Sequence, residues 1–281
     1  MPVVLGVTFD LDDTLWCGKT VLQNASGAFH AYVAQELPEL AEQFPPASFD
    51  ALLVQFQRAL PEHAHDYTFL RKHTLRHCVT TFGAQKLHLH DESKLTAFVD
   101  AAFRAFVVPR SQPELFDGVE HLFRELTTEI TLLNRPKNAT ATILGIITNG
   151  NCDITSLPEF FQHYIHFIIS AELVGCAKPS QAIFDAAVSK FSTSCRRHHF
   201  VHVGDHYTCD VEGAKRAGFR TIWVNSQWPR HDAFTRADLI DDDAAQYTAA
   251  DAIVKDVKTV VFVVQHWNAL ALETEGPWCS T

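Results

Sequence analysis

The stretch Phe9-Asp10-Leu11-Asp12-Asp13-Thr14-Leu15 marks an abrupt change of chemistry near the start of the chain. Residues 3–9 are apolar and favour β structure, which predicts a short buried strand. Three carboxylates follow at once, so the strand is expected to end in a polar loop. An aspartate cluster of this size exceeds what a turn or a helix N-cap requires. It indicates a site for chemistry at the end of the first strand.

Two different patterns follow this strand. Over residues 21–108 apolar side chains recur at intervals of three and four, which predicts a block of four or five helices. After this block, apolar runs alternate with helical stretches, and strands are expected at residues 142–147, 165–169, 200–203 and 221–224. Because each run is apolar throughout, the pattern predicts an α/β fold with a parallel sheet covered by helices on both faces. The helical block interrupts this domain after its first strand.

Polar clusters lie just after the predicted strands or in the loop that follows one. They are Asp10 with Asp12, Thr148 with Asn149, Lys178, and Asp205 with Asp210. Apart from the first, each cluster alone is compatible with an ordinary turn or cap. Turns and caps do not explain why all the clusters lie near the ends of strands. Ligands of open parallel sheets bind at the carboxyl ends of the strands, so this shared position indicates a binding site.

Charge repulsion limits what such a set of residues can do. If Asp10, Asp12 and Asp205 share one crevice, two carboxylates ~4 Å apart repel by roughly 4 kcal/mol at an effective dielectric near 20. Lys178 supplies one compensating charge, and a hard divalent cation bound by carboxylate oxygens, with Mg²⁺ the natural candidate, supplies two more. The remaining purpose of such a site is to hold an anion against carboxylates, and phosphate is the obvious anion.

The order of these clusters resembles that of the haloacid dehalogenase superfamily. Residues 9–15 resemble its first motif, DxDxT, and Ile147-Thr148-Asn149-Gly150 resembles the second. Lys178-Pro179 resembles the third motif, and residues 203–214 resemble the fourth. The likeness covers about residues 3–225. It implies a Rossmann-like parallel sheet core, residues 1–18 and 112–281, with an inserted all-helical cap domain, residues 19–111.

The resemblance also implies roles for individual side chains. Asp10 would be the nucleophile that forms an aspartyl-phosphate. Asp12 would protonate the leaving oxygen and then activate water. Thr148 and the backbone amide of Asn149 would bind phosphoryl oxygens, and Lys178 would neutralise charge on the nucleophile and the phosphoryl group.

A metal site follows from the same likeness. The carboxylates of Asp10 and Asp205 and the main-chain carbonyl of Asp12 would bind Mg²⁺, and Asp210 would support this shell from behind. The expected activity is Mg²⁺-dependent hydrolysis of a small phosphomonoester. A sugar phosphate or a flavin or nucleotide monophosphate is expected as substrate, because the pattern most resembles flavin mononucleotide hydrolases and N-acylneuraminate-9-phosphatases.

Three other functions remain open on this fold. A 2-haloacid dehalogenase needs the nucleophile but neither a second acid nor a metal, so Asp12 and the acidic fourth motif disfavour it. A phosphosugar mutase would share all four motifs. A non-catalytic binding protein would have lost catalytic side chains, yet every one of them is present.

Composition excludes several classes of partner. Lys and Arg number 23 and Asp and Glu 33, a net charge of −10, so nucleic acid and anionic membranes are not expected partners. The apolar runs are too short to span a bilayer.

Seven scattered cysteines without a CxxC pair, and no visible signal peptide, favour reduced thiols in the cytoplasm. The oligomeric state is not predicted.

Several residues have both a functional and a structural interpretation. His206 follows Asp205 and could contact a metal-bound water or the substrate. Trp16 could line the substrate pocket or pack the hinge of the cap. Arg71 and Arg76 could meet a second anionic group of the substrate, although such charges are usually a solvated helix face. Three histidine pairs have spacings compatible with a transition metal, but local hydrogen bonding is favoured: His63/His65, His73/His77 and His88/His90.

Overall fold

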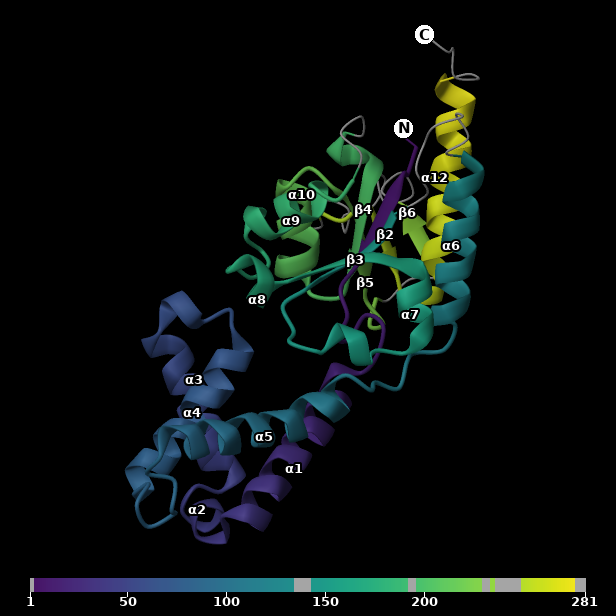
Figure 1. Cartoon of the computed structure of the whole chain (residues 1–281). Helices are drawn as coiled ribbons and strands as arrows, with labels where there is room; N and C mark the ends of the chain where they lie inside the picture. The colour runs from purple at the N-terminus through teal and green to yellow at the C-terminus, as the bar shows by residue number, and fades with distance from the viewer. Residues whose placement is uncertain (1–2, 134–142, 192–195, 229–232, 236–248, 276–281) are drawn as a thin grey trace.

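The centre of the molecule is a seven-stranded sheet in the order β3-β2-β1-β4-β5-β7-β6 (Figure 1). The computed structural model describes residues 3–133, 143–191, 196–228, 233–235 and 249–275. The strands are β1 (Gly6–Phe9), β2 (Ile143–Thr148), β3 (Ile165–Ser170), β4 (Phe200–Gly204), β5 (Arg220–Val224), β6 (Ala233–Thr235) and β7 (Ala252–Val254). All neighbouring pairs are parallel except β6–β7, which is antiparallel. The predicted parallel sheet is confirmed, with one antiparallel edge strand added.

Helices cover both faces of the sheet, as predicted. Figure 1 shows α6 (Val119–Leu133) and α12 (Val260–Glu275) side by side on one face, with α7 (Glu159–Tyr164) below them. The other face carries α8 (Ala171–Val174), α9 (Gln181–Val188) and α10 (Gly213–Arg216). Each face has its own apolar cluster. One is centred on side chains such as Phe9, Phe123 and Trp267, and the other on side chains such as Phe184 and Phe200.

An all-helical block is inserted directly after β1, and this prediction is also confirmed. Its helices are α1 (Gly18–Glu36), α2 (Pro38–Gln43), α3 (Pro46–Ala59), α4 (Tyr67–Phe82) and α5 (Glu92–Arg110). Figure 1 shows this cap extending away from the sheet, with α1 and α5 forming the connection to the core. A third apolar cluster lies wholly within it, between Ala25 and Val107.

The two segments that join the cap to the core run next to each other. Trp16 forms an antiparallel bridge with Leu115, and the amide of Phe116 donates a hydrogen bond of 2.9 Å to the carbonyl of Leu15. The chain therefore leaves and re-enters the core at one place. This place adjoins the carboxyl end of β1, where Asp10 follows Phe9.

The fourth motif winds first as a π-helical turn, Tyr207–Glu212, and continues as α10 from Gly213. The His206 side chain accepts a hydrogen bond from the amide of Cys209 and so caps the start of this turn. In the described part of the chain, no helix is long and apolar enough to cross a membrane. Cys17, Cys78, Cys152, Cys176 and Cys209 are free thiols, and Cys195 and Cys279 lie outside the described residues.

Candidate active site

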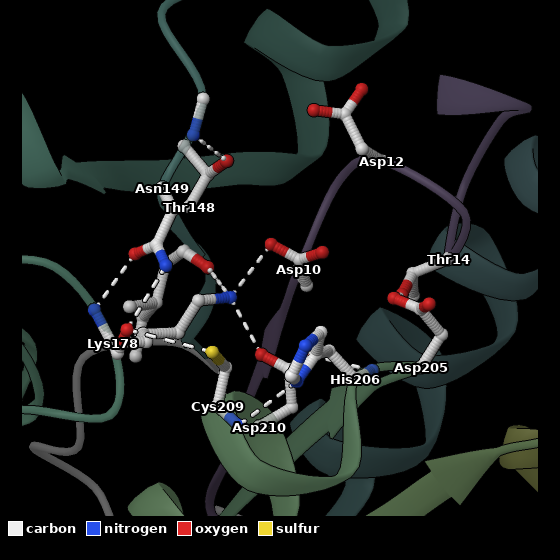
Figure 2. A network of polar contacts seen from close by, with 12 residues as sticks. Asp10, Asp12, Thr14, Thr148, Asn149, Lys178, Asp205, His206, Cys209 and Asp210 are labelled. Atoms are coloured by element: carbon white, nitrogen blue, oxygen red, sulfur yellow. Dashed lines mark hydrogen bonds and ion pairs between the residues drawn. The ribbon is translucent and has the colours of Figure 1, made fainter. Parts of the chain in front are cut away.

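The strand order brings the predicted site residues together. β1 lies between β2 and β4, so the residues that follow these three strands meet at one edge of the sheet. Asp10 follows β1, Thr148 ends β2 and Asp205 follows β4. Lys178 comes from the loop between α8 and α9. Figure 2 shows its ammonium group between Asp10 and Asp210.

Lys178 is the centre of a buried charge network. Its ammonium lies 2.6 Å from Oδ1 of Asp10, 2.6 Å from Oδ1 of Asp210 and 2.7 Å from the carbonyl oxygen of Ile147. An ammonium has three protons to donate, so all three have an acceptor here. Burial alone would lower the pKa of Lys178, but the two carboxylates raise it above its usual value. Lys178 is therefore held as a cation.

The two carboxylates on Lys178 differ in environment. Burial raises the pKa of Asp10 to about 7, and Lys178 offsets only part of this effect. Burial would also raise the pKa of Asp210, but Lys178 and His202 hold it well below its usual range. Nε2 of His202 lies 3.2 Å from Oδ1 of Asp210, and the amide of His206 donates to Oδ2. Asp210 thus has both oxygens engaged, whereas Asp10 retains oxygen lone pairs for other contacts.

Asp205 completes an acidic group with Asp10 and Asp210. One carboxylate oxygen from each of the three lies within 4.8 Å of the others. Burial, with repulsion from Asp210 and Asp13, raises the pKa of Asp205 to about 6. Three carboxylates against one ammonium leave an excess of negative charge that a further cation would relieve. An all-oxygen donor set of this kind fits a hard divalent cation such as Mg²⁺.

Thr148 and Asn149 shape the loop opposite Asp10. The Asn149 side chain accepts a hydrogen bond of 2.7 Å from the amide of Lys178 and donates one of 3.0 Å to the Lys178 carbonyl. The Thr148 hydroxyl accepts from the amide of Gly150 at 3.0 Å. The Asn149 side chain is thus committed to holding the Lys178 loop against β2.

The Asp12 carboxylate lies apart from this network. Figure 2 shows it turned away from Asp10. Its Oδ1 accepts a hydrogen bond of 2.8 Å from Nε1 of Trp16, and its Oδ2 lies 2.5 Å from Nη2 of Arg110. The Trp16 ring is fully buried beside Phe161, so this indole both packs the hinge and contacts the site.

Other residues singled out in the sequence have structural contacts. The exposed His206 ring caps the turn that holds Asp210. Arg76 forms an ion pair with Glu92, and the Arg71 guanidinium lies 3.9 Å from the centre of the Phe106 ring inside the cap. His73 and His77 pack edge-on against Phe56, and among the described residues the metal-capable groups of three contain no histidine.

Sequence reasoning missed Arg110 and His202. Arg110 lies 98 positions from Asp12, so no local pattern links the two residues. His202 lies in a run that the apolar pattern predicts as a buried strand, and a histidine in the middle of such a run indicates a polar partner inside the core. Its Nδ1 lies 2.9 Å from the Thr8 hydroxyl, and burial lowers its pKa.

Gly204 gives a test of the packing beneath the site. A Cβ at this position would overlap the Asp210 carboxylate. Gly204→Ala is therefore expected to destabilise the fold by about 1–3 kcal/mol and to displace Asp210 from Lys178. Urea denaturation measures the change. As a matched control, the Cβ of Gly27→Ala on α1 meets no atom of the described residues within 4 Å, and this substitution is expected to stabilise the protein by up to about 1 kcal/mol. Equal effects of the two substitutions would contradict the packing argument.

Comparison with known proteins identifies the family. A family model described as haloacid dehalogenase-like hydrolase matches residues 4–218. The chain belongs to this family. The expected superfamily and enzyme class, a hydrolase, are therefore confirmed.

Individual members of this hydrolase family are similar over different lengths. The 5-amino-6-(5-phospho-D-ribitylamino)uracil phosphatase YigB of Escherichia coli is 26% identical over 226 residues, which is 80% of this chain and 84% of that protein. The pyrimidine 5'-nucleotidase YjjG of Escherichia coli is 30% identical over 46% of this chain and 58% of its own length. Among solved structures, a 2-haloacid dehalogenase from Pseudomonas syringae has a TM-score of 0.74 at 27% identity and covers 94% of this chain and 100% of its own.

Proposed function

We propose that this hydrolase is a Mg²⁺-dependent phosphatase that removes phosphate from a small phosphomonoester through an aspartyl-phosphate on Asp10. The observation that carries the proposal is the contact of Asp10 with the buried Lys178, beside the carboxylate of Asp205. This arrangement presents a carboxylate nucleophile next to positive charge. A dianionic phosphoryl group requires both features.

In the first half-reaction, a free oxygen of Asp10 attacks phosphorus while the bond from phosphorus to the ester oxygen breaks. Protonated Asp12 gives its proton to the departing oxygen, which leaves as an alcohol. Lys178 stays on Asp10 and neutralises charge on the phosphoryl group. The Thr148 hydroxyl and the backbone amide of Asn149 bind phosphoryl oxygens during the transfer.

In the second half-reaction, the Asp12 carboxylate takes a proton from water as the water oxygen bonds to phosphorus. The bond from phosphorus to the Asp10 oxygen breaks and inorganic phosphate forms. Asp10 returns as a carboxylate and Asp12 returns as an acid, so protons balance over the cycle.

The oxygen donors described above fit Mg²⁺. We propose that the Asp10 and Asp205 carboxylates and the Asp12 carbonyl hold this ion, with Asp210 fixed behind them by Lys178 and the amide of His206. When bound, Mg²⁺ would supply positive charge that lowers the repulsion between the carboxylates and the phosphate.

We propose residues 1–18 and 112–281 as the catalytic core and 19–111 as the cap that covers the substrate. A covering cap excludes water and restricts the substrate to small molecules. The names of the relatives support this substrate class, since YigB and YjjG are named for small phosphorylated metabolites. Sugar phosphates and flavin or nucleotide monophosphates are the first compounds to test.

The similar structure from Pseudomonas syringae supports one rival function, 2-haloacid dehalogenation. Displacement of halide from carbon needs Asp10 but gains nothing from an acid such as Asp12 or from three clustered carboxylates. The group of Asp10, Asp205 and Asp210 therefore favours phosphate chemistry.

One screen separates these functions. The purified chain is incubated with a panel of phosphomonoesters, with Mg²⁺ and with EDTA, and phosphate release is measured. L-2-chloropropionate is tested in parallel for chloride release. We expect phosphate release that EDTA abolishes. Chloride release without metal and without phosphatase activity would assign a dehalogenase. Transfer to a second sugar hydroxyl would assign a mutase, and no reaction at all would favour a binding protein.

A further inference from the structure

Arg110 is a buried cation at the boundary between cap and core. It is the last residue of α5, the helix that returns the chain from the cap, and only 1% of its surface is exposed. Its Nη2 contacts the Asp12 carboxylate, whereas Nε and Nη1 have no hydrogen-bond partner among the residues that the structure describes. A buried guanidinium with unpaired N–H groups is costly. Stability alone therefore gives no reason for an arginine at this position.

The surrounding residues leave room for this ion pair. A Cβ on Gly150 would lie 2.6 Å from Nη2 of Arg110 and 3.1 Å from Oδ2 of Asp12. Only glycine at position 150 permits the approach. Trp16 holds the other oxygen of Asp12 from the opposite segment of the hinge. The carboxylate is thus held at both oxygens by residues from the two segments that join cap and core.

We propose that Arg110 is a positioning residue that fixes the Asp12 carboxylate on the cap side of Asp10. This inference rests on the phosphatase function proposed above. Asp10 attacks phosphorus from the sheet, so the leaving oxygen departs on the opposite side, towards the cap. Figure 2 shows the Asp12 carboxylate turned away from Asp10. It lies against Arg110 at the end of the cap helix α5.

The position of Arg110 in the fold links the acid to the cap. Because Arg110 ends α5, a shift of that helix moves the group that holds Asp12. Proton transfer depends on heavy-atom distances within hydrogen-bond reach, so a small displacement suffices to slow it. When the cap covers the substrate, Arg110 therefore holds Asp12 within hydrogen-bond reach of the leaving oxygen. When the cap is displaced, Asp12 moves out of this reach.

Arg110→Gln tests this role, with Arg104→Gln as the control because Arg104 is exposed on the same helix. With an alkyl phosphate, whose leaving oxygen needs a proton, we expect kcat to fall by about 10²-fold in Arg110→Gln. With p-nitrophenyl phosphate the first half-reaction needs no proton, so only the second slows. We expect a burst of nitrophenolate and accumulation of phosphoenzyme, which a merely structural defect would not produce.

A double-mutant cycle that combines Arg110→Gln with Asp12→Asn measures the coupling between these two residues. If Arg110 acts through Asp12, the double variant is no slower than Asp12→Asn alone. A further loss in the double variant, or the same kinetics in Arg110→Gln and Arg104→Gln, would overturn the inference. If the wild type releases no phosphate from any ester, the proposed function fails instead.

A crystal structure provides a readout independent of activity. In Arg110→Gln the Asp12 carboxylate is expected to leave the position seen here, and in Arg110→Lys to retain it. An unmoved carboxylate in Arg110→Gln would also overturn the positioning role. Should Arg110→Gln fail to fold, Arg110→Met serves in the kinetic test with the same burst expected, and Arg110→Lys is expected to show no burst because it keeps a cation beside Asp12.

Discussion

Asp10→Asn is expected to lower kcat by at least ~10⁴-fold, because an amide cannot form the acyl phosphate that the proposed reaction needs. The substitution conserves shape in a nearly buried position, so the fold is expected to persist. Phosphate release and trapping of phosphoenzyme measure the loss. Mass spectrometry must establish that the asparagine has not deamidated. Turnover within tenfold of the wild type would refute the nucleophile assignment.

The stability of the same variant has a defined pH dependence. Burial raises the pKa of Asp10 from 3.8 to about 7, so the folded state binds a proton that the unfolded state has lost. Without metal, Asp10 therefore makes the wild type less stable as the pH rises from about 4 to 7. Asp10→Asn removes this contribution. Urea titrations in EDTA are expected to show a smaller loss of stability across that range in the variant.

Lys178→Met is expected to affect both stability and activity. The substitution leaves Asp10 and Asp210 buried without their shared cation, and breaking a buried pair in this way costs about 3–5 kcal/mol. The loss of charge beside the phosphoryl group is expected to lower kcat/KM by about 10³-fold. Denaturation in EDTA and in Mg²⁺ measures the first effect. Mg²⁺ is expected to restore part of the stability, since it supplies positive charge to the same carboxylates.

Lys258→Met is the matched control for this charge. Lys258 also contacts two carboxylates, those of Asp117 and Asp256, but it is exposed to solvent. Exposed ion pairs contribute little because water screens them. Similar losses of stability in the two lysine variants would show that burial adds nothing to the contribution of the Lys178 network to stability.

Much of the fold could be predicted because its signals are local. The apolar run before Asp10 and the later apolar runs coincide with β1, β2, β3, β4 and β5 to within a few residues. The convergence of Asp10, Thr148 and Asp205 follows from a general property of parallel sheets, which align the carboxyl ends of neighbouring strands. The contact between Lys178 and Asp10 lies in the same crevice, as the charge argument required.

What could not be predicted depends on long-range contacts. Arg110 lies at the end of a helical pattern that gives no sign of a polar partner. It reaches Asp12 because α5 returns to the core. β7, β6 and α12 lie beyond residue 225, where the superfamily likeness ends. The π-helical turn before α10 is set by the His206 cap and by the demand that Asp210 reach Lys178. No spacing rule in the sequence expresses either condition.

The two adjacent segments that join the cap to the core have an evolutionary consequence. Trp16 and Leu115 close the base of the insertion. Among the described residues, the apolar cluster inside the cap is separate from that of the sheet, to which the cap contributes Val21 near the start of α1. Evolution can therefore replace one helical insert with another without changing the order of the strands. The inserted segment would have to include a residue that holds the Asp12 carboxylate in position, as Arg110 does here. Chimaeras that omit it would inherit a new specificity together with a slow enzyme.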